Sequence, residues 1–242
     1  MNMDIQNGLN KGRFPDCQGN KKLMSYSLII GFMFIFMGNS LSAFAQKQQN
    51  FNLFNLQNQA KLKVLNRKVE AINEQGIKFI RLAENSKEGI IWLPIKNFEN
   101  GTIEIEMRGK DVPQRSFIGV IFHGQNDSTY DAVYCRPFNF FAKDSVRKIH
   151  AIQYVSHPEF PWKKLRDTRN GEFEKEIISP PNPNGWFTMR VKVDNKTVEA
   201  FINQKEKPSL VVEKLTNTKN GKLGIFVGDT SGGDFRSVKI IK

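Results

Sequence analysis

Apolar and polar residues alternate with a period of two along most of the chain after residue 46, and helical periodicity is nearly absent. The segment TIEIEMR (102–108) is a clear case, because its apolar residues fall on one face of a strand and its two glutamates on the other. The pattern predicts about thirteen strands. We expect them at residues 60–66, 68–73, 77–82, 89–93, 102–108, 116–124, 129–136, 150–156, 186–193, 197–203, 209–215, 222–228 and 235–241.

Short clusters of Gly, Asn and Asp separate these strands, for example Glu99-Asn100-Gly101 and Lys219-Asn220-Gly221. Many short antiparallel strands with such turns predict an all-β fold, a two-sheet antiparallel β-sandwich. No Pro/Ser/Gly-rich linker and no internal repeat divides the chain, so residues 46–242 are expected to form a single domain.

One long connection interrupts the alternation, HPEFPWKKLRDTRNGEFEKEIISPPNPNG at residues 157–185. It is rich in proline and charge, and a connection of this length in a compact domain is usually functional or disordered. Its four large apolar side chains favour order; they are Phe160, Trp162, Leu165 and Phe173. We therefore expect an ordered flap that lies over one face of the sandwich.

The first 45 residues have the pattern of a signal peptide. Lys21 and Lys22 precede an apolar run, 28–37, that is too short to span a bilayer, and Ala43-Phe44-Ala45 forms a small-x-small cleavage motif. We expect cleavage after Ala45, translation from either Met1 or Met24, and a secreted or periplasmic protein with no membrane span.

Cleavage would also remove Cys17 and leave Cys135 alone, so no internal disulfide is expected in the mature chain. The formal charge would fall from +12 to about +10, since four basic and two acidic residues leave with the leader. The basic residues are spread among acidic ones, which favours a solvated basic surface over a nucleic-acid footprint.

Residues 123–157 hold all three histidines and all the tyrosines of the mature chain. Period-two geometry places Tyr130, Tyr134 and Arg136 on one face of their strand and Cys135 on the core face. Gly119 on the preceding strand would let a neighbouring group approach the backbone closely. If the strands are neighbours, four side chains converge on one concave sheet face, namely His123, Tyr134, Arg136 and Gln153. The flap that carries His157 and Trp162 would close the site from above.

Planar polar groups beside aromatic faces suit a sugar ring, since the first bind hydroxyls and the second cover the C–H side. An alternative interpretation is structural, with the tyrosines packed on a half-buried sheet and Arg136 paired with Glu104 or Glu106.

Metal binding is weakly indicated by the sequence. The histidines lack H-x-H or H-E-x-x-H spacing, so zinc is not expected and no cofactor is predicted. The turn GDTSGGD (228–234) could bind calcium through Asp229 and Asp234, but ordinary turn chemistry explains it better.

Hydrolysis of a glycoside requires a pair of carboxylates. Glu104 and Glu106 share a strand face about 7 Å apart, and Asp131 beside Tyr130 is a further candidate acid. No G-x-S-x-G elbow and no Gly-rich phosphate loop is present.

The succession of motifs resembles secreted bacterial concanavalin A-like lectin/glucanase (laminin-G-like) domains, near the 3-keto-disaccharide hydrolase domain family. The blocks that carry the resemblance are GIIWL, NGTIEIEMRGKD, FIGVIFHGQNDSTYDAVYCRPFNF, HAIQYVSHPEFPW, WFTMRVKV, PSLVVEKL, GKLGIFVGDTSGGDF and VKII. The resemblance implies a jelly roll whose concave face meets carbohydrate. The glucanase E-x-D-x-x-E strand is absent, and Phe122-His123 and Ala151-Ile152-Gln153 stand where the hydrolase family has F-F-R-like and E-x-Q segments.

Three functions remain open at this point. The first is a carbohydrate-binding domain with the site under the flap. The second is a glycoside hydrolase-type enzyme acting on oligosaccharides, oxidised ones included, with Glu104, Glu106 or Asp131 as acid or base. The third is a non-catalytic envelope domain that binds a protein partner of unknown identity.

Overall fold

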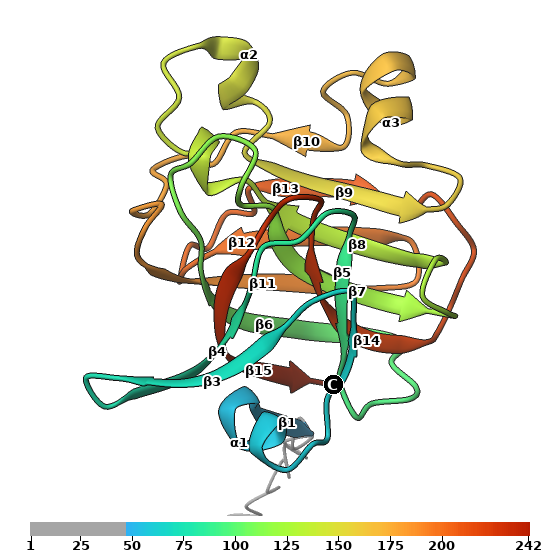
Figure 1. The fold of residues 1–242 in the computed structure, drawn as a ribbon. Coiled ribbons are helices and arrows are strands. Elements are labelled where there is room, and N and C mark those ends of the chain that lie inside the picture. Colours follow the sequence, from blue (N-terminus) through green and yellow to red (C-terminus); the bar gives the residue numbers. More distant parts are fainter. Residues whose placement is uncertain (1–46) are drawn as a thin grey trace, which may run out of the picture. The chain divides into compact units, whose positions relative to one another are not determined.

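A computed structural model describes residues 47–242 (Figure 1). The predicted signal peptide, 1–45, and its cleavage after Ala45 lie outside the described residues and stay predictions. No helix within the described range is long and apolar enough to cross a membrane.

Two antiparallel sheets make up the fold. The eight-stranded sheet runs in the order β13 (Leu210–Glu213), β12 (Thr197–Ile202), β11 (Trp186–Val193), β6 (Gly101–Arg108), β15 (Gly233–Ile241), β4 (Ile77–Leu82) and β3 (Val69–Glu74), and β1 (Gln48–Asn52) also pairs with β15. The seven-stranded sheet runs in the order β10 (Glu174–Lys175), β9 (Ile152–His157), β8 (Tyr130–Cys135), β7 (Ile118–Gly124), β14 (Lys222–Val227), β5 (Gly89–Trp92) and β2 (Lys63–Leu65). The prediction of an all-β, two-sheet sandwich is therefore confirmed.

All the strands expected from the alternation are present, with ends that differ by a few residues. The pattern missed β1, which has the sequence QQNFN and is mostly exposed, and the two-residue strand β10. Backbone pairing holds both strands on their sheets, β1 on β15 and β10 on β9, and the one buried residue of β10 is the charged Glu174 rather than an apolar side chain. An alternation search detects burial, so it cannot find strands of this kind.

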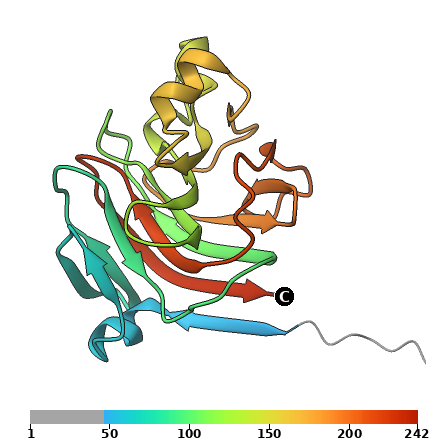
Figure 2. The ribbon, with the colours of Figure 1, turned by 90° about the vertical axis from the view of Figure 1, so that its right-hand side faces the viewer.

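Short helices were also not predicted: α1 (Leu53–Asn58), the 3₁₀ turn η1 (Pro137–Asn139), α2 (Ser145–Lys148) and α3 (Trp162–Thr168). Each has seven residues or fewer, too few for a helical period to be visible in the sequence. Helices α2 and α3 lie on the same side of the strands in both views, at the top of Figures 1 and 2.

The core lies between the two sheets. On β6 the apolar residues Ile103, Ile105 and Met107 are buried, whereas the intervening glutamates are half-buried. Cys135 on β8 meets Met189 on β11 across the core, with 3.8 Å between the two sulfur atoms, which confirms the predicted core position of Cys135. Each fully buried aliphatic side chain contributes on the order of 2 kcal/mol to stability through removal from water.

The central strands β7 and β8 of the seven-stranded sheet are buried on both faces, unlike β6 of the eight-stranded sheet. Every residue of β7 and β8 is buried, because one face packs on the core and the other lies under the segments that follow β8 and β9. The predicted flap, 157–185, is ordered and contains α3 and β10. This second, covered face holds the candidate site.

Candidate functional site

A cavity of about 530 Å³ lies on the outer face of the seven-stranded sheet. Because Cys135 points toward the other sheet, its neighbours Tyr134 and Arg136 point away from the core and toward this cavity. The lining residues are Glu88, Pro113, Gln114, Phe117, Tyr134, Arg136, Phe138, Asn139, Val146, Arg147, His150, His157, Trp162, Arg166, Phe226, Gly228, Asp229 and Thr230.

The floor of the cavity is aromatic, and a glycine makes it possible. Gly119 on β7 pairs with Tyr134 on β8 and with Phe226 on β14. Two rings separated by a third strand would normally stand about 10 Å apart, yet these two lean over Gly119 until their centroids are 5.0 Å apart. A Cβ atom at Gly119 would collide with the carbonyl oxygen of Val133 and with Tyr134. The close approach predicted for Gly119 is thus confirmed.

Arg136 covers one end of this floor. Its guanidinium lies 5.0 Å from the centre of the Tyr134 ring and 5.5 Å from that of Phe117. It donates one hydrogen bond to the Tyr134 hydroxyl at 3.0 Å and another, very short, to Gln153 Oε1. The Tyr134 hydroxyl in turn donates to the same Gln153 oxygen at 2.7 Å. Burial raises the pKa of Tyr134, so this hydroxyl keeps its proton.

The side chains at this end of the cavity surround one carboxylate, which sequence analysis did not identify. Glu174 of β10 accepts two hydrogen bonds from Arg166 of α3, at 2.9 and 2.8 Å, and lies 3.5 Å from Arg136 Nη1. His150 Nδ1 lies 2.7 Å from the same carboxylate. Burial alone would raise the pKa of Glu174, but the hydrogen bond from Arg166 and the charges of both arginines outweigh it and hold the pKa below its ordinary value. The carboxylate is therefore ionised and links the flap to the sheet.

Acidic side chains lie at the opposite side of the cavity, next to β5 and β14. Glu88 accepts a hydrogen bond from the Tyr130 hydroxyl at 2.7 Å and lies 3.7 Å from His157 Nε2. The His157 ring stacks on that of Tyr130 with centroids 5.0 Å apart. Asp229 accepts from the backbone N–H of Lys87 at 2.5 Å. The cavity is therefore basic on the β8–β9 side and acidic on the β5–β14 side.

Arg67, another residue that sequence analysis did not identify, positions the acidic side. It is buried, with 8% of its surface exposed, and its guanidinium donates to backbone carbonyl groups rather than to a carboxylate. The acceptors are the carbonyls of Asn66 (2.6 Å), Lys87 (2.9 Å), Val227 (3.5 Å), Gly228 (2.7 Å) and Ser231 (3.2 Å). Burial lowers its pKa, against the effect of the charges of Asp229 and Glu88. These bonds fix the two chain segments that carry the acidic groups.

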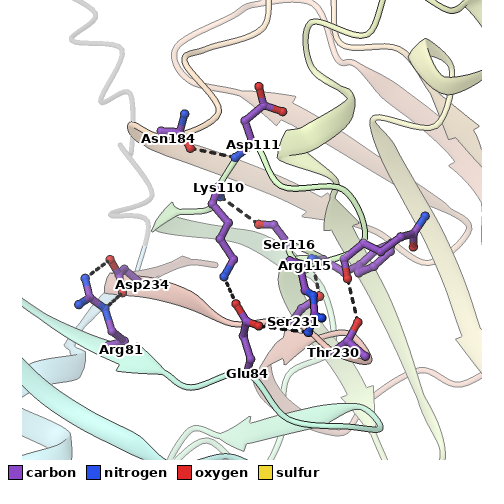
Figure 3. A network of polar contacts seen from close by, with 12 residues as sticks. Arg81, Glu84, Lys110, Asp111, Arg115, Ser116, Asn184, Thr230, Ser231 and Asp234 are labelled. Carbon is purple, nitrogen blue, oxygen red and sulfur yellow. Dashed lines mark hydrogen bonds and ion pairs between the residues drawn. The ribbon is translucent and has the colours of Figure 1, made fainter.

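The β6–β7 loop (residues 109–117) forms a further wall and is anchored by the polar network in Figure 3. Thr230 Oγ1 donates to the Gln114 carbonyl at 2.8 Å, and Ser231 Oγ accepts from the Phe117 N–H at 3.2 Å. Farther out, the figure shows Glu84 between Lys110 and Arg115, and Asn184 bound to the backbone N–H of Asp111. Gln114 and Phe117 thereby stay at the cavity.

The structure brings four of the six predicted ligand-binding residues to the cavity lining, namely Tyr134, Arg136, His157 and Trp162. Trp162, the first residue of α3, is 44% exposed at the rim, and Arg166 stacks on its ring at 5.0 Å. Gln153 is fully buried behind Tyr134. It therefore holds the Tyr134 hydroxyl in place rather than contacting a ligand in the cavity. The predicted role of the flap as a cover for this face agrees with the place of α3.

His123 is not at the cavity, and its predicted convergence with Tyr134 and Arg136 is corrected. The pairing of β7 with β14 shifts between Gly124 and Ile121, and His123 has a positive φ of 52° there. This bulge breaks the alternation on which the prediction rested. The His123 ring lies instead beside Asp131, with 3.4 Å between Nδ1 and Oδ2, and its Nε2 is 2.7 Å from the Glu99 carbonyl oxygen.

The three candidate acids of a hydrolase also lie outside the cavity. Asp131 is on the core face of β8 and accepts a hydrogen bond from the Tyr154 hydroxyl at 3.1 Å. Glu104 and Glu106 are on the outer face of the other sheet, where Glu106 pairs with Arg236 at 2.9 Å. The alternative pairing of Arg136 with Glu104 or Glu106 is wrong for the same reason, since Arg136 reaches Glu174 instead.

No group of three or more His, Cys, Asp or Glu side chains within residues 47–242 is arranged to hold a metal ion. The predicted calcium ligands are engaged separately. Both carboxylate oxygens of Asp234 bind the guanidinium groups of Arg81 and Arg108, at 2.7–3.0 Å, and Asp229 caps a backbone N–H. A carboxylate held between two arginines does not favour a cation.

Known structures share this fold. A Bacillus subtilis protein with a galectin-like fold matches at a TM-score of 0.55, with 10% identity over 81% of this chain and 97% of that chain. The Bacillus licheniformis β-glucanase matches at 0.50, with 11% identity over 81% and 98%, and the Ca²⁺/Man2-bound exoplasmic/lumenal domain of VIP36 at 0.50, with 12% identity over 75% and 80%. No family model matches the chain, and no curated protein matches it significantly. The fold is that of the concanavalin A-like lectins and glucanases, as the sequence resemblance implied.

Proposed function

We propose that the protein binds a carbohydrate in the cavity over the seven-stranded sheet. The observation that carries the proposal is the aromatic floor of Tyr134 and Phe226, which lies between a basic side and an acidic side. A sugar ring can place its C–H face on such a floor and direct its hydroxyls to the charged groups at either side. The exposed ring of Trp162 at the rim supplies a second stacking surface.

The fold supports the proposal without specifying the ligand. VIP36 was solved with Man2 bound, and the β-glucanase is named for its action on a glucan. Related folds host both binding proteins and enzymes, so the fold does not decide between them. The carboxylates on which the hydrolase hypothesis rested do not reach the cavity, so the binding function is the one favoured by the geometry.

Glycan-array screening followed by calorimetric titration of the best glycan tests the proposal. Trp162→Ala is expected to lower the affinity about tenfold or more, because it removes a stacking surface at the rim. Phe141→Ala is the matched control, since Phe141 is 62% exposed and does not line the cavity. Absence of binding across a broad panel, or full affinity in Trp162→Ala, would contradict the proposal.

A secreted or periplasmic location is part of the proposal and rests on the leader pattern in residues 1–45. N-terminal sequencing of protein recovered from the producing cell tests it, with Gln46 expected as the first residue. A mature protein that begins at Met1 or Met24 would contradict it.

A further inference from the structure

The basic side of the cavity has more positively charged side chains than carboxylates to pair with them. Arg136, Arg147 and Arg166 line it, and among the described residues only Glu174 forms ion pairs with any of them. Three positive charges against one negative charge leave about two in excess at this side. Burial lowers the pKa of His150, which therefore adds no charge near neutral pH.

Arg147 is held in place without being neutralised. Its Nε donates to Asn139 Oδ1 at 3.3 Å and its Nη2 to the Phe138 carbonyl at 3.1 Å, and both acceptors are uncharged. The Asp144 carboxylate at the start of α2 accepts from the backbone N–H of Arg147, not from its guanidinium. Nη1 of Arg147 has no hydrogen-bond partner within residues 47–242. Arg147 is exposed at the edge of the cavity, and its two hydrogen bonds restrict the guanidinium, so less entropy is lost when the guanidinium binds an anion.

Arg166 reinforces this arrangement. Both Nε and Nη2 of Arg166 bind Glu174, so the guanidinium plane is fixed, and its Nη1 has no partner among the described residues. The Trp162 ring stacks on one face of the Arg166 guanidinium. A planar anion such as a carboxylate matches the geometry of guanidinium groups better than a neutral hydroxyl does.

From these observations we infer that the cavity selects a glycan with an anionic substituent, a uronic acid carboxylate, which Arg147 and Arg166 bind while the sugar ring lies on the Tyr134–Phe226 floor. The inference deepens the proposed carbohydrate binding and rests on it. The acidic side, with Glu88 and Asp229, faces the part of the glycan that carries hydroxyl groups only. Sulfate esters also carry a negative charge, so the test compares carboxylated with sulfated glycans.

The experiment compares matched glycans by calorimetric titration: oligouronates, their methyl esters, and sulfated oligosaccharides with their unsulfated parents. The oligouronate is expected to bind at least about tenfold more tightly than its ester, since charge-assisted hydrogen bonds are lost on esterification. Arg147→Gln should weaken binding of the oligouronate far more than binding of the ester, and so remove most of that difference. Arg236→Gln, an exposed arginine on the other sheet, is the control and should change neither affinity.

Equal or tighter binding of the neutral partners would overturn the inference while leaving carbohydrate binding in place. Preference for sulfated over carboxylated glycans would overturn the assignment of a carboxylate. Absence of binding to any glycan would overturn both this inference and the proposed function. An unchanged preference in Arg147→Gln would show that Arg147 does not bind the anion.

Discussion

The guanidinium of Arg166 and the carboxylate of Glu174 form a two-bond ion pair, with distances of 2.9 and 2.8 Å, inside the connection between β9 and β11. The same carboxylate also faces Arg136 from the sheet below. One buried acidic group therefore ties helix α3 to the end of β8, where the cavity begins. The rim and the floor of the proposed site depend on this contact.

Replacement of Glu174 by Gln should lower the free energy of unfolding by about 3 kcal/mol, because it leaves the largely buried Arg136 without its counter-charge. Urea denaturation measures the change. Glu172→Gln is the matched control in the same flap. Glu172 is exposed and pairs with Arg169 at 2.7 Å, so its loss should cost less than about 0.5 kcal/mol. Equal costs for the two variants would contradict the assigned role of Glu174.

The same group predicts a dependence of stability on pH. The pKa of Glu174 in the folded protein lies below its ordinary value of 4.5, so the unfolded chain takes up the proton first as pH falls. Its contribution to stability is complete above pH 4.5 and is lost as pH falls through the folded-state pKa. The stability difference between wild type and Glu174→Gln should therefore be largest near neutral pH and shrink as the pH falls below 4.5. Urea denaturation across this pH range checks it, and a difference that grows toward low pH would show the opposite sign.

Gly119→Ala should destabilise the protein by about 3 kcal/mol and disturb the floor, because the added methyl group meets the Val133 carbonyl and Tyr134. Thermal unfolding and near-UV circular dichroism of the tyrosines follow the two effects. Gly185→Ala is the control, since its nearest neighbour would be the Asn182 side chain at an ordinary 3.4 Å. If Gly119→Ala retains full stability, the close packing of Tyr134 and Phe226 over β7 is not required.

Arg67→Met should cost about 3 kcal/mol of unfolding free energy, because buried carbonyl groups of Gly228 and Ser231 lose a charged donor. Chemical denaturation measures it. Hydrogen exchange should also rise selectively in segments 86–89 and 228–231, which Arg67 joins. The same replacement at the exposed Arg236 should change stability by less than about 0.5 kcal/mol. Uniformly raised exchange throughout the domain would indicate general destabilisation rather than the local role assigned to Arg67.

The sequence by itself determined the fold class and nearly every strand, because alternation of apolar and polar residues is a local consequence of placing one strand face in the core. It also separated Tyr134 and Arg136 from Cys135, since that assignment needs only the period of two. The same rule failed at His123, where a bulge changes the period and turns the side chain toward Asp131.

Only the tertiary structure decided which side chains meet. Glu174 reaches Arg136 across 38 positions of the sequence, and Arg67 reaches Ser231 across 164. Neither contact can be recognised from a short stretch of sequence. Both depend on the register of distant strands and on the path of the flap. The aromatic floor over Gly119 also required knowing that β14 and β8 both lie beside β7. The local sequence pattern determines where the strands lie along this chain. The set of side chains in the cavity depends on contacts between residues that are distant in the sequence.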